Sequence, residues 1–153
     1  MKIVLLAPSG KNYKKDMESL DQIQDSISEE FELFDTWMEK YEYIIDLGKK
    51  LDTLSENEMT DENKVHGCQS SVWFVTSIED GIFRCKAMSD SAIVSGLIAL
   101  LMRIYDNQRP SDIVQAEPKF ISMIGLNEHL SPTRNNGLNL MIARIKQDAK
   151  LMT

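Results

Sequence analysis

The feature that most restricts how this chain can fold is residues 92–104, whose side chains would be apolar on nearly every face of a helix. A helix that is apolar all round has no face to present to water, so it must lie buried at the centre of a domain. Ser89 or Asp90 is its predicted N-cap, and residues 107–110 break it just after Tyr105. Its apolar residues are Ile93, Val94, Leu97, Ile98, Leu100, Leu101 and Ile104.

Two amphipathic helices are predicted before this centre. Residues 20–34 carry apolar side chains every three or four positions, separated by acidic or polar ones. Thr36 and Glu39 have the spacing of a capping box for a second helix, which Gly48 ends. The apolar side chains of the second helix are Trp37, Tyr41, Ile44, Ile45 and Leu47.

Further helices are predicted in the last third of the chain. Short helical pieces occupy residues 111–115 and 118–124. Ser131 followed by Pro132 is typical of a helix start, and this last helix runs to about Leu151. Its predicted inward face is formed by Leu138, Met141, Ile142, Ile145 and Ala149.

Between the helices lies a predicted hairpin. Residues 72–75 are β-branched or aromatic, residues 79–81 carry an Asp-Gly turn signal, and residues 82–88 alternate as a returning strand. This alternation places Cys85 on the apolar side with Phe83, so we expect it in the core. We therefore expect an α+β domain with a short antiparallel three-stranded sheet and helices packed on one face.

Composition excludes several partners and sites. A formal net charge of −7 and a pI near 4.8 argue against a nucleic-acid partner. The apolar run at residues 3–7 is too short for a secretory signal, and residues 92–104 are too short to span a bilayer, so we expect no membrane partner and a cytoplasmic protein. Its cysteines, Cys68 and Cys85, should then stay reduced, and their spacing with the histidines makes no metal site.

Cys68 is the candidate functional residue. It lies just before the first strand, beside Gly67, whose backbone can adopt a bend that presents a thiol. Most free cysteines are buried for packing and are inert. Polar or small neighbours flank Cys68 on both sides, which is untypical of a packing cysteine.

The string His66–Trp73 resembles the Gly-Cys-Gln-Ser-x-Val-Trp signature of the SufE family, the sulfur acceptors of iron–sulfur cluster assembly. Residues 40–48, 89–98 and 129–138 resemble further blocks of this family, in its order. The resemblance implies a SufE-like domain over residues 17–153, similar in fold to scaffolds of the IscU type. Residues 1–16, with a candidate strand at residues 3–6, precede it as an extension that we expect to be disordered or to lie on the surface.

The resemblance also implies a reaction. A pyridoxal-phosphate cysteine desulfurase, SufS- or CsdA-like, would hold sulfur as a persulfide that the Cys68 thiolate accepts and passes to an iron–sulfur scaffold. The chain would activate that desulfurase without being an enzyme itself. It would need no cofactor of its own, because pyridoxal phosphate belongs to the partner. The sequence leaves open a monomer or a homodimer.

Arg134 matches an arginine of the family pattern, where a guanidinium near Cys68 would stabilise a sulfur anion. Read from the residues alone, Arg134 is equally an exposed arginine at a helix start. Gly67, Gln69 and His66 are supporting candidates: a hinge, a hydrogen-bond donor and a weaker assistant. Asp90 matches a family aspartate and most simply caps the central helix.

Two other functions stay open at this stage. The chain would be a non-covalent adaptor or scaffold if Cys68 were incidental. It would be a thiol redox protein if Cys68 reacted with a resolving cysteine, but Cys85 is expected in the core and the chain has no Cys-x-x-Cys motif.

Overall fold

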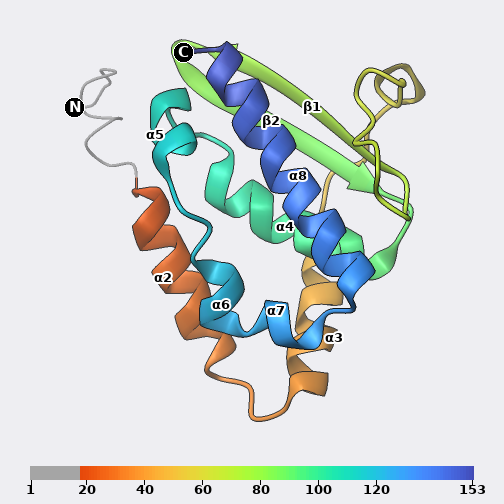
Figure 1. Ribbon diagram of the computed structural model, residues 1–153, viewed down its shortest axis with the longest axis vertical. Coiled ribbons are helices and arrows are strands. Elements are labelled where there is room, and N and C mark those ends of the chain that lie inside the picture. Colours follow the sequence, from red (N-terminus) through yellow and green to blue (C-terminus); the bar gives the residue numbers. More distant parts are fainter. Residues whose placement is uncertain (1–17) are drawn as a thin grey trace, which may run out of the picture.

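The computed structural model describes residues 18–153 (Figure 1). The predicted extension at residues 1–16, with its strand at residues 3–6, lies outside the described residues. The elements are α2 (Leu20–Phe31), α3 (Trp37–Gly48), η1 (Glu56–Glu58), β1 (Val72–Glu79), β2 (Ile82–Ser89), α4 (Ala92–Tyr105), α5 (Pro110–Gln115), α6 (Phe120–Ile124), α7 (Leu126–His129) and α8 (Pro132–Leu151).

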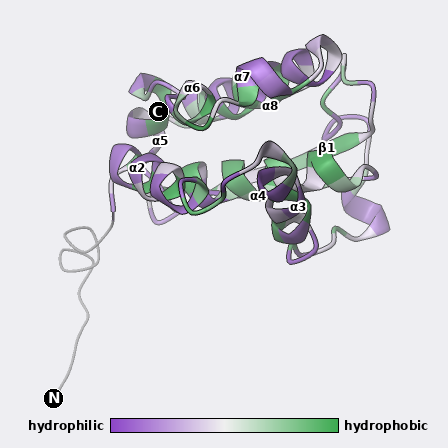
Figure 2. Cartoon of the chain, turned by 90° about the horizontal axis from the view of Figure 1, so that it is seen from below, coloured by the Kyte–Doolittle hydropathy of each residue, from purple (hydrophilic) through white to green (hydrophobic). Residues whose placement is uncertain are grey.

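Helix α4 is the centre of the domain, as its sequence predicts. It packs against α2, α3, β2 and α8. Figure 2 shows α2, α3 and α4 with β1 in one layer and α6, α7 and α8 in another, with hydrophobic residues prominent along α4 and β1. The buried residues of α4 are Ile93, Val94, Gly96, Leu97, Ile98, Leu100, Leu101, Ile104 and Tyr105.

The helix starts follow local side-chain chemistry. Thr36 and Glu39 form the predicted capping box of α3, and the Ser131 hydroxyl caps α8 ahead of Pro132. The predicted cap of α4 was wrong: the Ser91 Oγ accepts the Val94 N–H at 3.4 Å. Among residues 18–153, no helix is both long and apolar enough to cross a bilayer.

The α+β class is confirmed, but the sheet has two strands in the described residues instead of three. β1 and β2 pair antiparallel, joined by Asp80 and Gly81, both at positive φ. Residues 63–65 run beside β1, where the Val65 N–H donates to the Val72 carbonyl at 2.9 Å. This pairing does not extend to residues before Asn63, because residues 61–63 form a turn in which the Lys64 N–H donates to the Asp61 carbonyl, so a third strand does not develop.

Two glycines allow α3 and α4 to pack closely. A Cβ on Gly48 would lie 2.5 Å from the Gly96 backbone nitrogen, and a Cβ on Gly96 would overlap the Ile44 carbonyl. Backbone atoms cannot move aside as a flexible side chain can. The position of the central helix therefore depends on the absence of a side chain at this crossing.

Gly96→Ala should lower the free energy of unfolding by about 2 kcal/mol or more, because the added methyl meets backbone atoms in a packed core. Gly137→Ala in α8 is the matched control. There the nearest atom to a new Cβ is the Cys68 Sγ at 3.7 Å, and alanine favours the helix by about 1 kcal/mol. Urea denaturation of both variants measures the difference; equal stabilities would contradict the packing account.

Candidate functional site

Cys68 lies on a short loop whose two ends are hydrogen-bonded. At its start the Val65 N–H pairs with β1. At its end the Ser71 N–H donates to the Asp90 Oδ1 at 3.1 Å, and the Asp90 N–H donates back to the Ser71 carbonyl. Asp90 therefore fixes the loop end and does not cap α4, contrary to the sequence prediction. Gly67 has a φ of 95°, a conformation that glycine adopts at low cost.

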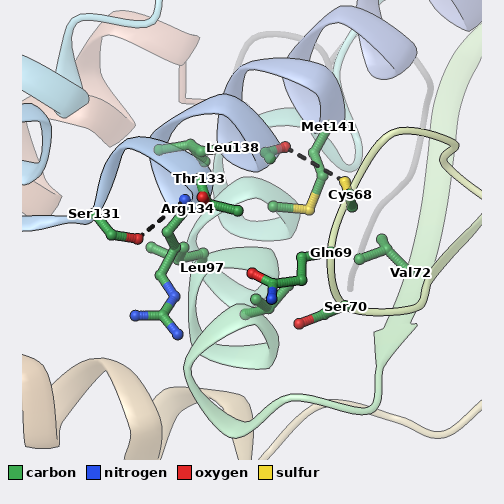
Figure 3. A pocket seen from close by; sticks show the side chains of 12 residues that line it. Cys68, Gln69, Ser70, Val72, Leu97, Ser131, Thr133, Arg134, Leu138 and Met141 are labelled. Carbon is green, nitrogen blue, oxygen red and sulfur yellow. Dashed lines mark hydrogen bonds between the residues drawn. The ribbon is translucent and has the colours of Figure 1, made fainter.

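The thiol of Cys68 faces a pocket between this loop, α4 and α8 (Figure 3). Its Sγ lies 3.8 Å from the carbonyl oxygen of Gly137, and the residue is half-buried. The pocket encloses about 50 Å³, enough for an atom of the size of a water molecule. Its apolar lining consists of Val72, Val94, Leu97, Leu138 and Met141, and its polar lining includes Gln69, Ser70, Ser131, Thr133 and Arg134.

Burial raises the pKa of the Cys68 thiol above its ordinary value. A thiol in an apolar environment keeps its proton because the thiolate would lose hydration there. In the described arrangement Cys68 is therefore protonated at neutral pH. A protonated thiol is a poor nucleophile, so the chain holds its candidate nucleophile in a resting form.

Arg134 borders the same pocket but is directed elsewhere. Its Nη1 donates to the Tyr41 hydroxyl at 3.1 Å, and Figure 3 shows the guanidinium pointing away from Cys68. The arrangement thus brings Arg134 to the site without the thiolate stabilisation expected from the sequence. That role stays a prediction for a rearranged state.

Of the other supporting candidates, Gln69 lies at the pocket and His66 does not. Gln69 borders the pocket beside Cys68. The exposed His66 ring instead lies against Asp61, with its Nε2 at 3.3 Å from the backbone carbonyl and 3.8 Å from the carboxylate. It is not among the residues that line the pocket. The structure therefore places Gln69 and Arg134 with Cys68, and His66 apart from it.

Sequence reasoning missed several residues of this site. Gly137, Leu138 and Met141 line the pocket from α8, and Tyr41 holds Arg134 from α3. The α8 residues lie three, four and seven positions after Arg134, a spacing that places them on one helix face. That spacing was a usable signal, whereas the pairing with Tyr41 joins distant parts of the chain.

Cys85 is in the core, as predicted, and its burial strongly raises its pKa. Its backbone N–H donates to the Asp106 Oδ1 at 2.9 Å, which fixes this part of β2. Within residues 18–153, no group of three or more His, Cys, Asp or Glu side chains is arranged to hold a metal ion. The site is therefore built around one partly accessible thiol.

The rate of Cys68 alkylation by iodoacetamide should rise with pH around a midpoint above that of cysteine in an unstructured peptide, because only the thiolate reacts. Arg134→Gln should leave this midpoint unchanged in the free protein, since the guanidinium is hydrogen-bonded to Tyr41. Mass spectrometry of quenched samples gives both rates. A midpoint below the peptide value would contradict a desolvated thiol.

Known proteins of one family resemble this chain. The family model of SufE, the Fe–S metabolism associated domain, matches residues 25–149. An uncharacterised SufE-like protein of Rhizobium meliloti (strain 1021) is 44% identical over 139 residues, covering 88% of this chain and 96% of that protein. An uncharacterised SufE-like protein of Rhizobium etli is 42% identical over 140 residues, covering 88% and 92%.

The fold is shared with a solved structure. The solution structure of a hypothetical protein from Thermus thermophilus is similar with a TM-score of 0.71 and 18% sequence identity. The similarity covers 85% of this chain and 95% of that one. Together with the family match over most of the chain, these findings show that this protein belongs to the SufE family, whose domain is associated with iron–sulfur metabolism.

Proposed function

We propose that this chain accepts sulfur from a pyridoxal-phosphate cysteine desulfurase and carries it as a persulfide on Cys68. The observation that carries the proposal is a half-buried thiol facing a small pocket with apolar and polar walls within a SufE domain. The pocket that Cys68 lines has a volume of about 50 Å³, which is room for one additional atom.

The transfer is a thiol–persulfide exchange. The Cys68 thiolate attacks the terminal sulfur of the desulfurase cysteine persulfide. A new S–S bond forms on Cys68 while the S–S bond of the desulfurase breaks, and its electron pair stays on the desulfurase cysteine as a thiolate. The transferred sulfur keeps its oxidation state, so the step needs no external oxidant or reductant. The desulfurase is thereby ready for another turnover.

The resting geometry requires a change before this attack. Cys68 loses its proton only when it leaves its buried position or gains a cationic neighbour. Docking to the desulfurase would move Cys68 out of its buried position by displacing the loop at Gly67. Arg134 would be the cationic neighbour, if its guanidinium left the Tyr41 hydroxyl and bound the sulfur anion instead. Such coupling restricts the reactive thiolate to the docked complex.

The recipient of the sulfur would be an iron–sulfur scaffold, reached by the same exchange in the opposite direction. The protein itself would catalyse no C–S cleavage, because that chemistry belongs to the partner's pyridoxal phosphate. The proposal requires a reducing compartment that keeps Cys68 as a thiol, which describes the cytosol.

The alternative functions receive less support. A redox cycle needs a resolving thiol, and the chain's other cysteine, Cys85, is buried in β2. A purely non-covalent adaptor would not need a cysteine beside a pocket. A direct experiment distinguishes the adaptor function from the carrier function.

Cys68→Ser should abolish sulfur loading, while Cys85→Ala, the matched control at the other cysteine, should leave it intact. The protein is incubated with a cysteine desulfurase, pyridoxal phosphate and cysteine, and its intact mass is measured. The wild type should gain the mass of one or more sulfur atoms, mapped by peptide digestion to Cys68. Loading that survives Cys68→Ser, or desulfurase stimulation that is the same with and without Cys68, would favour the adaptor.

A further inference from the structure

The chain segment that leads to Cys68 contacts α8 at three successive positions. Gly137 contacts the Cys68 Sγ, and a Cβ on Gly67 would lie 3.0 Å from the Leu140 Cδ1. One turn further along α8, Arg144 reaches residues 62–64. The contacting α8 positions, 137, 140 and 144, are three or four residues apart and therefore lie on one face of the helix. Residues further before Cys68 in the chain contact residues further along α8.

Arg144 makes three charged hydrogen bonds on this face. Its Nη1 donates to the Lys64 carbonyl at 3.1 Å and its Nη2 to the Glu62 carbonyl at 2.8 Å. Its Nε donates to the Asp148 Oδ2 at 3.2 Å, and the two side chains are only 22% and 16% exposed. Hydrogen bonds from a charged and partly desolvated donor are stronger than neutral ones at the surface.

Asp148 connects Arg144 to the sheet. Its Oδ2 also accepts a hydrogen bond from the Thr76 hydroxyl at 2.9 Å. The carboxylate therefore orients the guanidinium from one side while β1 holds the carboxylate from another. Because the Arg144 guanidinium is already held in place, its two Nη groups bind the two carbonyls with little further loss of side-chain rotamer freedom.

The Cys68 loop packs against α8 but makes few hydrogen bonds of its own. For residues 66–70, the structure shows no backbone hydrogen bond to another segment, only the His66 contact with Asp61 and the long contact between Cys68 and Gly137. The loop is therefore positioned by its two ends. Asp90 fixes the end at Ser71, and Arg144 ties the segment before the other end to α8.

We propose that Arg144, oriented by Asp148, is a positioning residue that latches the Cys68 loop onto α8 in its sheltered state. This inference rests on the proposed function for its biological meaning, since a latch protects a persulfide only if Cys68 carries one. Loss of the two carbonyl contacts would raise the population in which Cys68 has left the pocket. Arg144 does not touch the reacting sulfur.

The test is Cys68 alkylation by iodoacetamide in the free protein, with peptide mass spectrometry to read each cysteine separately. Arg144→Met keeps the apolar stem and removes the donors, so Cys68 should react about tenfold faster or more, as expected for the loss of at least one hydrogen bond from a charged donor. Arg144→Lys keeps the charge without the fork and should give an intermediate rate. Arg109→Met, which removes a surface arginine paired with Asp112 in α5, should leave the rate unchanged.

Cys85 is the internal control for unfolding, because its thiol is buried in the core. A faster reaction at Cys68 with an unchanged rate at Cys85 supports the latch. An unchanged rate at Cys68, or equal acceleration at both cysteines, overturns it. No desulfurase is present, so this outcome is independent of sulfur loading: failure of wild-type loading would refute the carrier function, while the alkylation rates would still decide the latch.

Discussion

The packing of the Cys68 segment against one face of α8 is the contact on which the site depends. The Gly137 carbonyl contacts the thiol, Leu140 lies against the bend at Gly67, and Arg144 holds the preceding residues. The helix is itself fixed by its buried side toward the core, where Leu138, Met141 and Ile145 are covered. Helix α8 therefore both packs in the core and determines the position of the Cys68 sulfur.

The burial that would shelter a bound sulfur atom also suppresses the reactivity of the thiol. A desolvated thiol keeps its proton, and the nearest candidate cation, Arg134, is hydrogen-bonded to Tyr41. For a carrier this combination is useful, because an exposed thiolate would react with cellular oxidants and a free persulfide with cellular reductants. Under the proposed function, the partner would have to make Cys68 reactive, which would couple sulfur transfer to docking.

How far the sequence predicted this structure depends on the range of each interaction. The Thr36–Glu39 capping box and the Ser131–Pro132 start are local, and both are confirmed. The apolar helix at residues 92–105 could only be central. The third strand was wrong because the turn at residues 61–63 ends the pairing beside β1. The cap of α4 was wrong because Asp90 is bonded to Ser71, a contact between distant positions.

The site was predictable only in part. Its cysteine and glycine were singled out by their neighbours and by the resemblance to the family. The partners Tyr41 for Arg134 and residues 62–64 for Arg144 were not, since each joins positions 80 to 93 residues apart through side-chain direction. No pattern in the chain shows that a charged side chain will point away from the nearby thiol.

The central claim is that the folded domain shelters a sulfur atom bound to Cys68. Its most direct test is the rate at which dithiothreitol removes that sulfur from the loaded protein, compared with the rate for a persulfide on a peptide of residues 63–73. The account predicts slower removal from the folded protein, because the pocket excludes the reductant. Equal rates, or a protein that cannot be loaded at Cys68, would contradict it.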